Sequence, residues 1–260
     1  VVYSSMQNDG DPHLLQARLE FPGATPLSIP SGLIFSISKN AEMLVGLNPR
    51  RRQASFFETT LARLPLLGGA PRLILEGVKF ADWSPTDDSI MVVRLDGSQE
   101  RLEFPIGTVL YETEGEIGFA RISPDGNQVA FLEWPVKTDD RGTLAIVDRK
   151  ATRQMTTGTF EAVRSLAWTP DGREVWFSAA KAGNQYDVWS VGLGRPERRI
   201  YGAPAGLLLN DIAKDGKLLV SRYDRSVSVE GVFDGEKSPR DLSWLGGAFA
   251  QDLSRDGRRV

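Results

Sequence analysis

Short apolar runs, separated by polar turns, recur along the whole chain. The two clearest copies are residues 120–131 (ARISPDGNQVAF) and 166–177 (LAWTPDGREVWF). In both, an apolar run leads into a Pro-Asp-Gly turn, and a second apolar run follows. Pro fixes φ where the first turn position needs it, and Gly tolerates the positive φ that comes next. The pattern predicts a tight turn between two antiparallel strands, with positive φ at Gly126 and Gly172.

Two further apolar runs follow each of these turns. The predicted strands of the first unit are residues 117–122, 128–132, 143–148 and 153–155, and those of the second are 163–168, 174–178, 187–191 and 198–201. Four antiparallel strands per unit form one blade of a β-propeller. The chain lacks the long runs of 3.6-residue period that a helical repeat would need.

Weaker copies of the same unit extend the repeat over the chain. The residues that take the Ser position of the turn, which we call anchors, are Ser38, Ser84, Ser123, Thr169, Ala213 and Ser254. Their spacings are 46, 39, 46, 44 and 41 residues, within the range of propeller repeats. We therefore expect an all-β fold, a single six-bladed propeller over residues 1–260.

The two ends of the chain are predicted to share the last blade. Counting from Ser254 to the C-terminus and on from Val1 to Ser38 gives 44 residues, which matches the internal period. Residues 249–253 would then supply the inner strand, and residues 1–27 the outer strands. Shared termini would hide the raw sheet edges of the ring. Residues 1–3 and 258–260 both suit the second strand, and this choice stays open.

The repeat resembles that of the TolB-like (WD-like) β-propellers. The resemblance rests on Trp83-Ser84-Pro85, on Trp168-Thr169-Pro170-Asp171-Gly172, and on residues 64–73 (LPLLGGAPRL) and 188–191 (VWSV). It implies a propeller fold and says little about function, because one fold hosts many functions.

A narrower resemblance concerns residues 102–115 (LEFPIGTVLYETEG) and 166–168. They are similar to the propeller that follows a membrane helix in some bacterial serine/threonine protein kinases. This resemblance implies an extracytoplasmic sensor module. The residues themselves contain no kinase motif, so kinase activity is not assigned to them.

Composition removes several classes of chemistry. The chain has no Cys and one His, His13, which excludes thiol catalysis, Cys-ligated metals and multi-His metal sites. His13 follows a polar turn and is expected to be an ordinary surface residue. The net charge of −3 gives no electrostatic reason to bind nucleic acid or an anionic membrane. No apolar run is long enough for a transmembrane helix, and no signal peptide is visible. The ends suggest a piece of a longer protein.

A few residues are candidates for binding. Trp83 and Trp168 end inner strands, where they would either pack between blades or form a platform beside the channel. Arg50, Arg51 and Arg52 are expected in a long loop, either solvated or touching an acidic group. Asp139 and Asp140, like Asp87-Asp88, are solvated loop residues or a weak cation site.

The turn aspartates, Asp125, Asp171, Asp215 and Asp256, are expected to accept hydrogen bonds from nearby backbone amides. They are therefore not predicted to be catalytic acids.

No catalytic motif is recognisable, and neither a catalytic residue, a cofactor nor a metal is predicted. We expect a noncatalytic, monomeric binding module that holds a protein, peptide or small ligand at one mouth of the channel, outside the cytoplasm. One alternative is the propeller of a hydrolase or peptidase whose catalytic part lies elsewhere. The other alternative is a TolB-like envelope scaffold.

Overall fold

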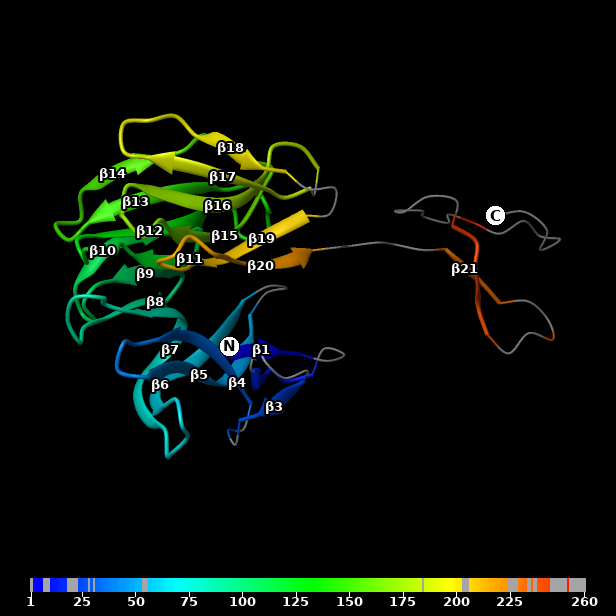
Figure 1. The fold of residues 1–260 in the computed structure, drawn as a ribbon, viewed down its shortest axis with the longest axis horizontal. Helices are drawn as coiled ribbons and strands as arrows, with labels where there is room; N and C mark the ends of the chain where they lie inside the picture. The colour runs from blue at the N-terminus through cyan, green and yellow to red at the C-terminus, as the bar shows by residue number, and fades with distance from the viewer. Residues whose placement is uncertain are drawn as a thin grey trace. The chain divides into compact units, whose positions relative to one another are not determined.

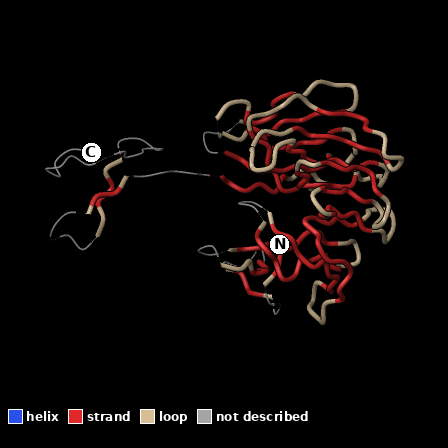
Figure 2. The backbone as a smooth tube through the Cα atoms, turned by 180° about the vertical axis from the view of Figure 1, so that it is seen from behind, coloured by secondary structure: helices blue, strands red, loops and turns tan. Residues whose placement is uncertain are grey.

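The computed structural model of the chain is built of β-strands and turns, and its described residues contain no helix (Figure 2). Consequently none of them belongs to a helix able to span a membrane. The structure describes residues 2–6, 10–17, 23–27, 29, 31–52, 56–183, 185–202, 206–223, 229–232, 235, 238–243 and 252. The chain divides into two compact units, Val1–Arg222 and Tyr223–Val260, and each is treated by itself.

The first unit contains several antiparallel sheets (Figure 1). The N-terminal sheet joins β1 (Val2–Ser5), β2 (His13–Ala17) and β3 (Ala24–Pro26). A seven-stranded sheet joins β4 (Gly32–Ile37), β5 (Glu42–Arg51), β6 (Phe57–Pro65), β7 (Arg72–Trp83), β8 (Ile90–Asp96), β9 (Gln99–Glu103) and β10 (Val109–Thr113).

Two four-stranded sheets and a strand pair follow. The sheets are β11 (Glu116–Ile122), β12 (Gln128–Trp134), β13 (Thr143–Asp148) and β14 (Arg153–Thr156), then β15 (Ala162–Trp168), β16 (Glu174–Ala180), β17 (Asp187–Gly192) and β18 (Arg198–Tyr201). The pair is β19 (Gly206–Ile212) and β20 (Leu218–Tyr223). In the second unit, β21 (Glu230–Gly231) and β22 (Arg240–Asp241) form a short antiparallel hairpin.

The two four-stranded sheets confirm the strands predicted from the repeat. In each, the residue before the anchor pairs with the sixth residue after it, Ile122 with Val129 and Trp168 with Val175. The tight turn between them fixes this register. Gly126 and Gly172 have φ of 76° and 68°, the positive values that the turn pattern predicts.

The seven-stranded sheet contains two repeat units because β7 belongs to both. Residues 72–75 of β7, and also Val78, pair with β6 as the outer strand of one unit. Residues 78–83 pair with β8 as the inner strand of the next. Gly77 lies between the two halves with φ of 75°, a conformation that favours glycine. The chain thus passes from one unit to the next without leaving the strand.

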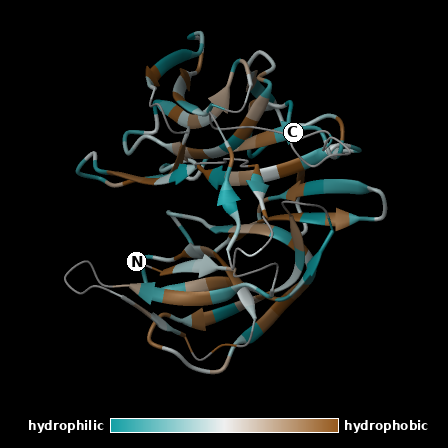
Figure 3. Cartoon of the chain, turned by 90° about the vertical axis from the view of Figure 1, so that its right-hand side faces the viewer, coloured by the Kyte–Doolittle hydropathy of each residue, from teal (hydrophilic) through white to brown (hydrophobic). Residues whose placement is uncertain are grey.

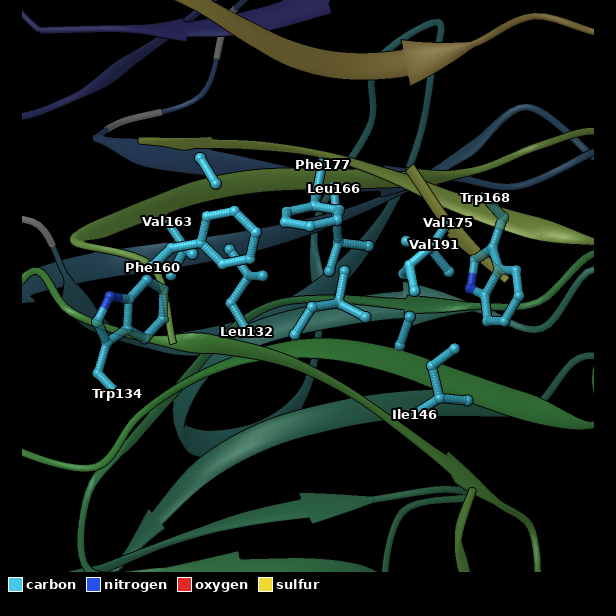
Figure 4. Close-up of a cluster of buried hydrophobic side chains, with 13 residues drawn as sticks. Leu132, Trp134, Ile146, Phe160, Val163, Leu166, Trp168, Val175, Phe177 and Val191 are labelled. Atoms are coloured by element: carbon cyan, nitrogen blue, oxygen red, sulfur yellow. The ribbon is translucent and has the colours of Figure 1, made fainter. Parts of the chain in front are cut away.

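The core lies between neighbouring repeat units, including the two units that share the seven-stranded sheet. Figure 4 shows the cluster between the sheets β11–β14 and β15–β18, where Leu132, Phe160 and Phe177 are fully buried. Burial of such a side chain contributes roughly 1.5–3 kcal/mol. In Figure 3, hydrophobic residues, coloured brown, lie largely on the strands that form this core. Each sheet therefore depends on its neighbour for stability.

The N-terminal sheet packs against the sheet that follows it. Leu14 of β2 is buried in a cluster with Met43 and Val45 of β5. Of the predicted inner strand at residues 249–253, all but residue 252 lie outside the described part of the chain. The anchor Ser254 also lies outside it.

Candidate functional site

A cavity of about 1260 Å³ lies where the inner strands of the first unit converge. Here an inner strand is the strand that runs into an anchor residue. Residues of β1, β4, β7, β11, β15, β19 and β20 line the cavity. Strands from each sheet of this unit therefore contribute to one site, which we call the channel.

One position of the repeat places polar side chains around the channel. The residue two before each anchor lines the cavity in five successive units, and we call these residues the channel ring: Ser36, Asp82, Arg121, Ala167 and Asp211. The ring combines one guanidinium with two carboxylates.

Asp82 joins three units. One oxygen of its carboxylate accepts a hydrogen bond from the Ser36 hydroxyl at 2.7 Å, and the other accepts from the Ile122 amide at 3.1 Å. Burial raises the pKa of Asp82, while Arg121 and these hydrogen bonds act in the opposite direction. Both oxygens are used within the channel wall, so Asp82 is mainly a positioning residue.

Arg121 has a different environment. Its guanidinium lies over the Phe80 ring, 5.1 Å from the centroid, and one of its amino groups donates to the Ala120 carbonyl at 3.1 Å. No carboxylate lies within ion-pair distance of Arg121 among the described residues. Most of its donors therefore remain available on the channel wall.

An aromatic cluster continues from the channel wall into the protein. Phe35 lines the cavity, and its ring centroid lies 5.8 Å from that of Phe80. The ring centroids of Phe80 and Phe119 are also 5.8 Å apart. Phe119 has φ of 52° at a bulge in β11. This conformation costs about 1–2 kcal/mol in a residue with a side chain. Because a bulge redirects the strand, it sets how the following Arg121 is presented.

Pro-Asp-Gly and related turns surround the mouth of the channel. Three described turn aspartates accept hydrogen bonds from the amide two residues later, at 3.1 Å for Asp125, 3.1 Å for Asp171 and 3.2 Å for Asp215. This confirms the predicted structural role of these residues. Asp256 lies outside the described residues.

The two candidate tryptophans lie between units and also line the cavity. Trp168, labelled in Figure 4, is 8% exposed. Its indole Nε1 donates to the Arg121 carbonyl at 3.0 Å. Trp83 is 7% exposed, and the Arg63 guanidinium lies over its ring, 5.1 Å from the centroid, but its Nε1 has no hydrogen-bond partner among the described residues. Packing accounts for most of the surface of both rings.

Comparison of the fold with solved structures, and not comparison of the sequence, finds known proteins that are similar to this chain. No family model matches the chain, and no curated protein is similar to it in sequence. A solved structure described as TolB from Agrobacterium tumefaciens superposes with a TM-score of 0.60 at 16% identity, covering 86% of this chain and 90% of that one. The fold is that of a TolB-like β-propeller.

Other solved propellers carry different descriptions. A protein of Bacteroides uniformis described as a 6-phosphogluconolactonase gives a TM-score of 0.55 at 13% identity over 98% of this chain and 85% of that one. Acylaminoacyl peptidase from Pyrococcus horikoshii gives 0.53 at 14% identity over 81% of this chain and 39% of that one. At these identities the likeness establishes only the fold.

Arg50 and Arg51 of the arginine cluster lie in a strand, contrary to our prediction, whereas Arg52 lies in the connection that follows it. β5 extends through Arg50 and Arg51, which pair with Glu58 and Phe57 of β6. Arg52 forms an ion pair with Glu58. Pro49 does not end the strand, because β5 shifts its register between Leu47 and Arg50 and resumes pairing. These arginines do not line the channel.

The two adjacent loop aspartates, Asp139 and Asp140, each form an ion pair with an arginine. Asp139 pairs with Arg141, whose hydrogen bond lowers the pKa of the aspartate. Asp140 pairs with Arg164 at 2.6 Å. The described residues contain no group of three or more metal-ligating side chains. His13 is exposed at the start of β2.

The channel ring itself was missed by sequence analysis. Its signal was present, since each member stands two residues before an anchor, but the residue types differ from unit to unit. A periodic position with varied polar side chains in otherwise apolar strands is the pattern that points to a channel wall.

Proposed function

We propose that the chain is a noncatalytic binding module, a six-bladed ring closed by both termini that holds a ligand or partner at its channel mouth. The chief support is the channel ring, where no described carboxylate lies within ion-pair distance of Arg121, beside a cavity of about 1260 Å³. Concave sites with a few convergent polar groups are typical of ligand binding. The rigid sheets would hold the turns at the mouth in fixed positions.

The proposed sixth blade and ring closure have two supports. The anchor spacing across the chain ends equals the internal period. In addition, β1 pairs with β2 along one edge and has no strand along its other edge among the described residues. An unpaired edge of this kind tends to acquire a partner strand.

The wider setting follows from the family resemblance. We propose an extracytoplasmic sensor or scaffold within a larger bacterial protein, such as a kinase or an envelope complex, that binds a protein, peptide or small ligand as a monomer. A kinase domain and a membrane helix encoded upstream would support the sensor setting.

A second candidate is the propeller of a peptidase. It is favoured by the similarity to acylaminoacyl peptidase, of which this chain matches 39%. An α/β-hydrolase domain encoded downstream would support it.

Selection of random displayed peptides on the immobilised chain tests the binding function. Substituting Pro124→Trp or Pro170→Trp at the cavity lining should weaken the selected peptides at least about tenfold, because a large ring would obstruct the mouth. The matched control is Leu67→Trp on the outer hairpin, where Leu67 is 99% exposed and away from the cavity lining. Binding that is lost in the control and kept in both mouth variants would contradict the proposal.

A further inference from the structure

The arginines of the first unit differ in how their charge is neutralised. Many have an acidic partner within 4.0 Å, including half-buried Arg94 with Glu103 at 2.6 Å and Arg164 with Asp140 at 2.6 Å. Arg50, Arg72, Arg121 and Arg195 have no such partner among the described residues. Arg121 alone of these four is half-buried, whereas the other three are exposed to solvent.

Burying half of a guanidinium without an acidic partner costs free energy unless other groups accept its hydrogen bonds and balance its charge. Burial reduces hydration, and a planar group with five donors is best satisfied by a two-oxygen acceptor. Phe80 supports one face of Arg121 at 5.1 Å, and the Ala120 carbonyl takes one donor. The remaining donors belong to a side chain that lines the cavity. A carboxylate is the group that matches them.

The charges near Arg121 restrict which carboxylates fit. Asp82 lies on the adjacent unit of the channel ring, but both its oxygens are already bonded within the wall. Asp211 lines the same cavity two units further on, with one oxygen bonded to the Ile212 amide and the other without a partner among the described residues. A simple anion would be attracted by Arg121 and repelled by both aspartates.

A dipolar ligand would match the charges of both Arg121 and Asp211. Its carboxylate would meet Arg121, and its ammonium group would be directed toward Asp211. Ala167 stands between these two units in the ring and carries neither a charge nor a hydrogen-bonding side chain, so it does not compete for either charge of the ligand.

We propose that the channel binds a small zwitterion of the amino-acid class, with Arg121 holding the carboxylate and Asp211 the ammonium group. This proposal rests on the proposed binding function and names the ligand chemistry of the same channel.

Calorimetric titration with a series of ω-amino acids tests it on the full chain. Glycine, β-alanine, 4-aminobutanoate and 6-aminohexanoate present the same two charges at increasing separation. Acetate and butylamine present only one charge each. We expect at least one zwitterion to bind at least about tenfold more tightly than either single-charge control, because it gains both charge-assisted contacts.

Substitutions then locate the site. Arg121→Gln and Asp211→Asn should each weaken the best zwitterion about tenfold or more. Arg121→Lys should bind the zwitterion more tightly than Arg121→Gln but less tightly than the unchanged chain, since an ammonium lacks the two-donor fork. Arg173→Gln is the matched control, because Arg173 is exposed and pairs with Asp171 at 3.7 Å. Melting curves check that each variant is folded.

The outcomes separate this proposal from the broader one. No binding by any zwitterion, equal binding of acetate, or binding that survives Arg121→Gln would overturn the zwitterion site. If displayed peptides still bind at the mouth in that case, the proposed binding function stands. If neither binds, both proposals fail.

Discussion

The indole Nε1 of Trp168 donates a hydrogen bond to the backbone carbonyl of Arg121, 3.0 Å away and 47 residues earlier in the chain. The bond joins the inner strands of two neighbouring blades at the channel wall. Trp83 occupies the same position one residue before its anchor, yet its buried Nε1 has no hydrogen-bond partner in the described part of the chain. At this repeat position, therefore, one tryptophan has a hydrogen-bonded indole N–H and the other has a buried indole N–H without a described partner.

This difference predicts unequal costs for the same substitution. Trp168→Phe should destabilise the chain about 1 kcal/mol more than Trp83→Phe, because only the first loses a hydrogen bond and leaves a carbonyl without its partner. Urea unfolding of both variants measures the difference. Equal costs would mean that the bond from Trp168 contributes nothing to the blade interface.

The Pro-Asp-Gly turns offer a second matched pair. Gly172→Ala should cost about 1–2 kcal/mol from backbone strain, because a Cβ there would meet nothing closer than Pro124 at 3.6 Å. Gly126→Ala should cost more, since its Cβ would lie 2.6 Å from the Thr86 hydroxyl. Adding Thr86→Ala should remove the excess. Thermal unfolding that ranks Gly172→Ala as the costlier change would contradict this reading of the turns.

These turns were predictable because their determinants are local. Pro, Asp and Gly fix the turn within four residues, and the register of β11 with β12 and of β15 with β16 follows from it. The sharing of β7 between two blades was not predictable. It depends on how residues 72–75 meet β6, a contact that the local pattern does not encode.

The channel ring shows the same limit. Its positions follow from the period, but its chemistry depends on neighbours from other blades. Arg121 is an ordinary arginine in sequence, and only the fold shows that it forms no ion pair within the part of the chain that the structure describes. The bulge at Phe119 is likewise a product of packing against Phe80 and Trp134.

Asp82 and Asp125 should give pH dependences of opposite sign. Burial raises the folded-state pKa of Asp82 above 3.8, so its contribution to stability is present at low pH and declines as the pH rises through the raised value. The Ser123 hydroxyl lowers the pKa of Asp125, so its contribution is present above 3.8 and declines as the pH falls through the lowered value.

Unfolding free energies at pH values from about 3 to 8 test this pair. With increasing pH, the chain should lose stability relative to Asp82→Asn and gain it relative to Asp125→Asn. The same sign for both variants would refute the assignment.

A buried charge cluster joins the second and third anchor units. Lys79 Nζ pairs with Glu100 and lies 3.3 Å from Glu116, and Glu100 also accepts the Ile117 amide at 2.8 Å. Lys79→Met should cost roughly 3–5 kcal/mol because the buried Glu100 carboxylate loses its ion-pair partner. The triple variant Lys79→Met, Glu100→Gln, Glu116→Gln should recover most of this loss in urea unfolding. A cost below about 1 kcal/mol for the single variant would show that solvent reaches the cluster.

Ring closure by the two termini is the central architectural claim of the proposed function, and hydrogen exchange at β1 measures it most directly. The backbone amides of Val2–Ser5 that point away from β2 have no strand partner among the described residues. If residues 249–253 complete this blade, these amides should exchange slowly in the full chain and lose protection when residues 245–260 are deleted. β12, in a complete blade, should keep its protection in both proteins. Fast exchange at β1 in the full chain, or protection that survives the deletion, would contradict closure of the ring by both termini.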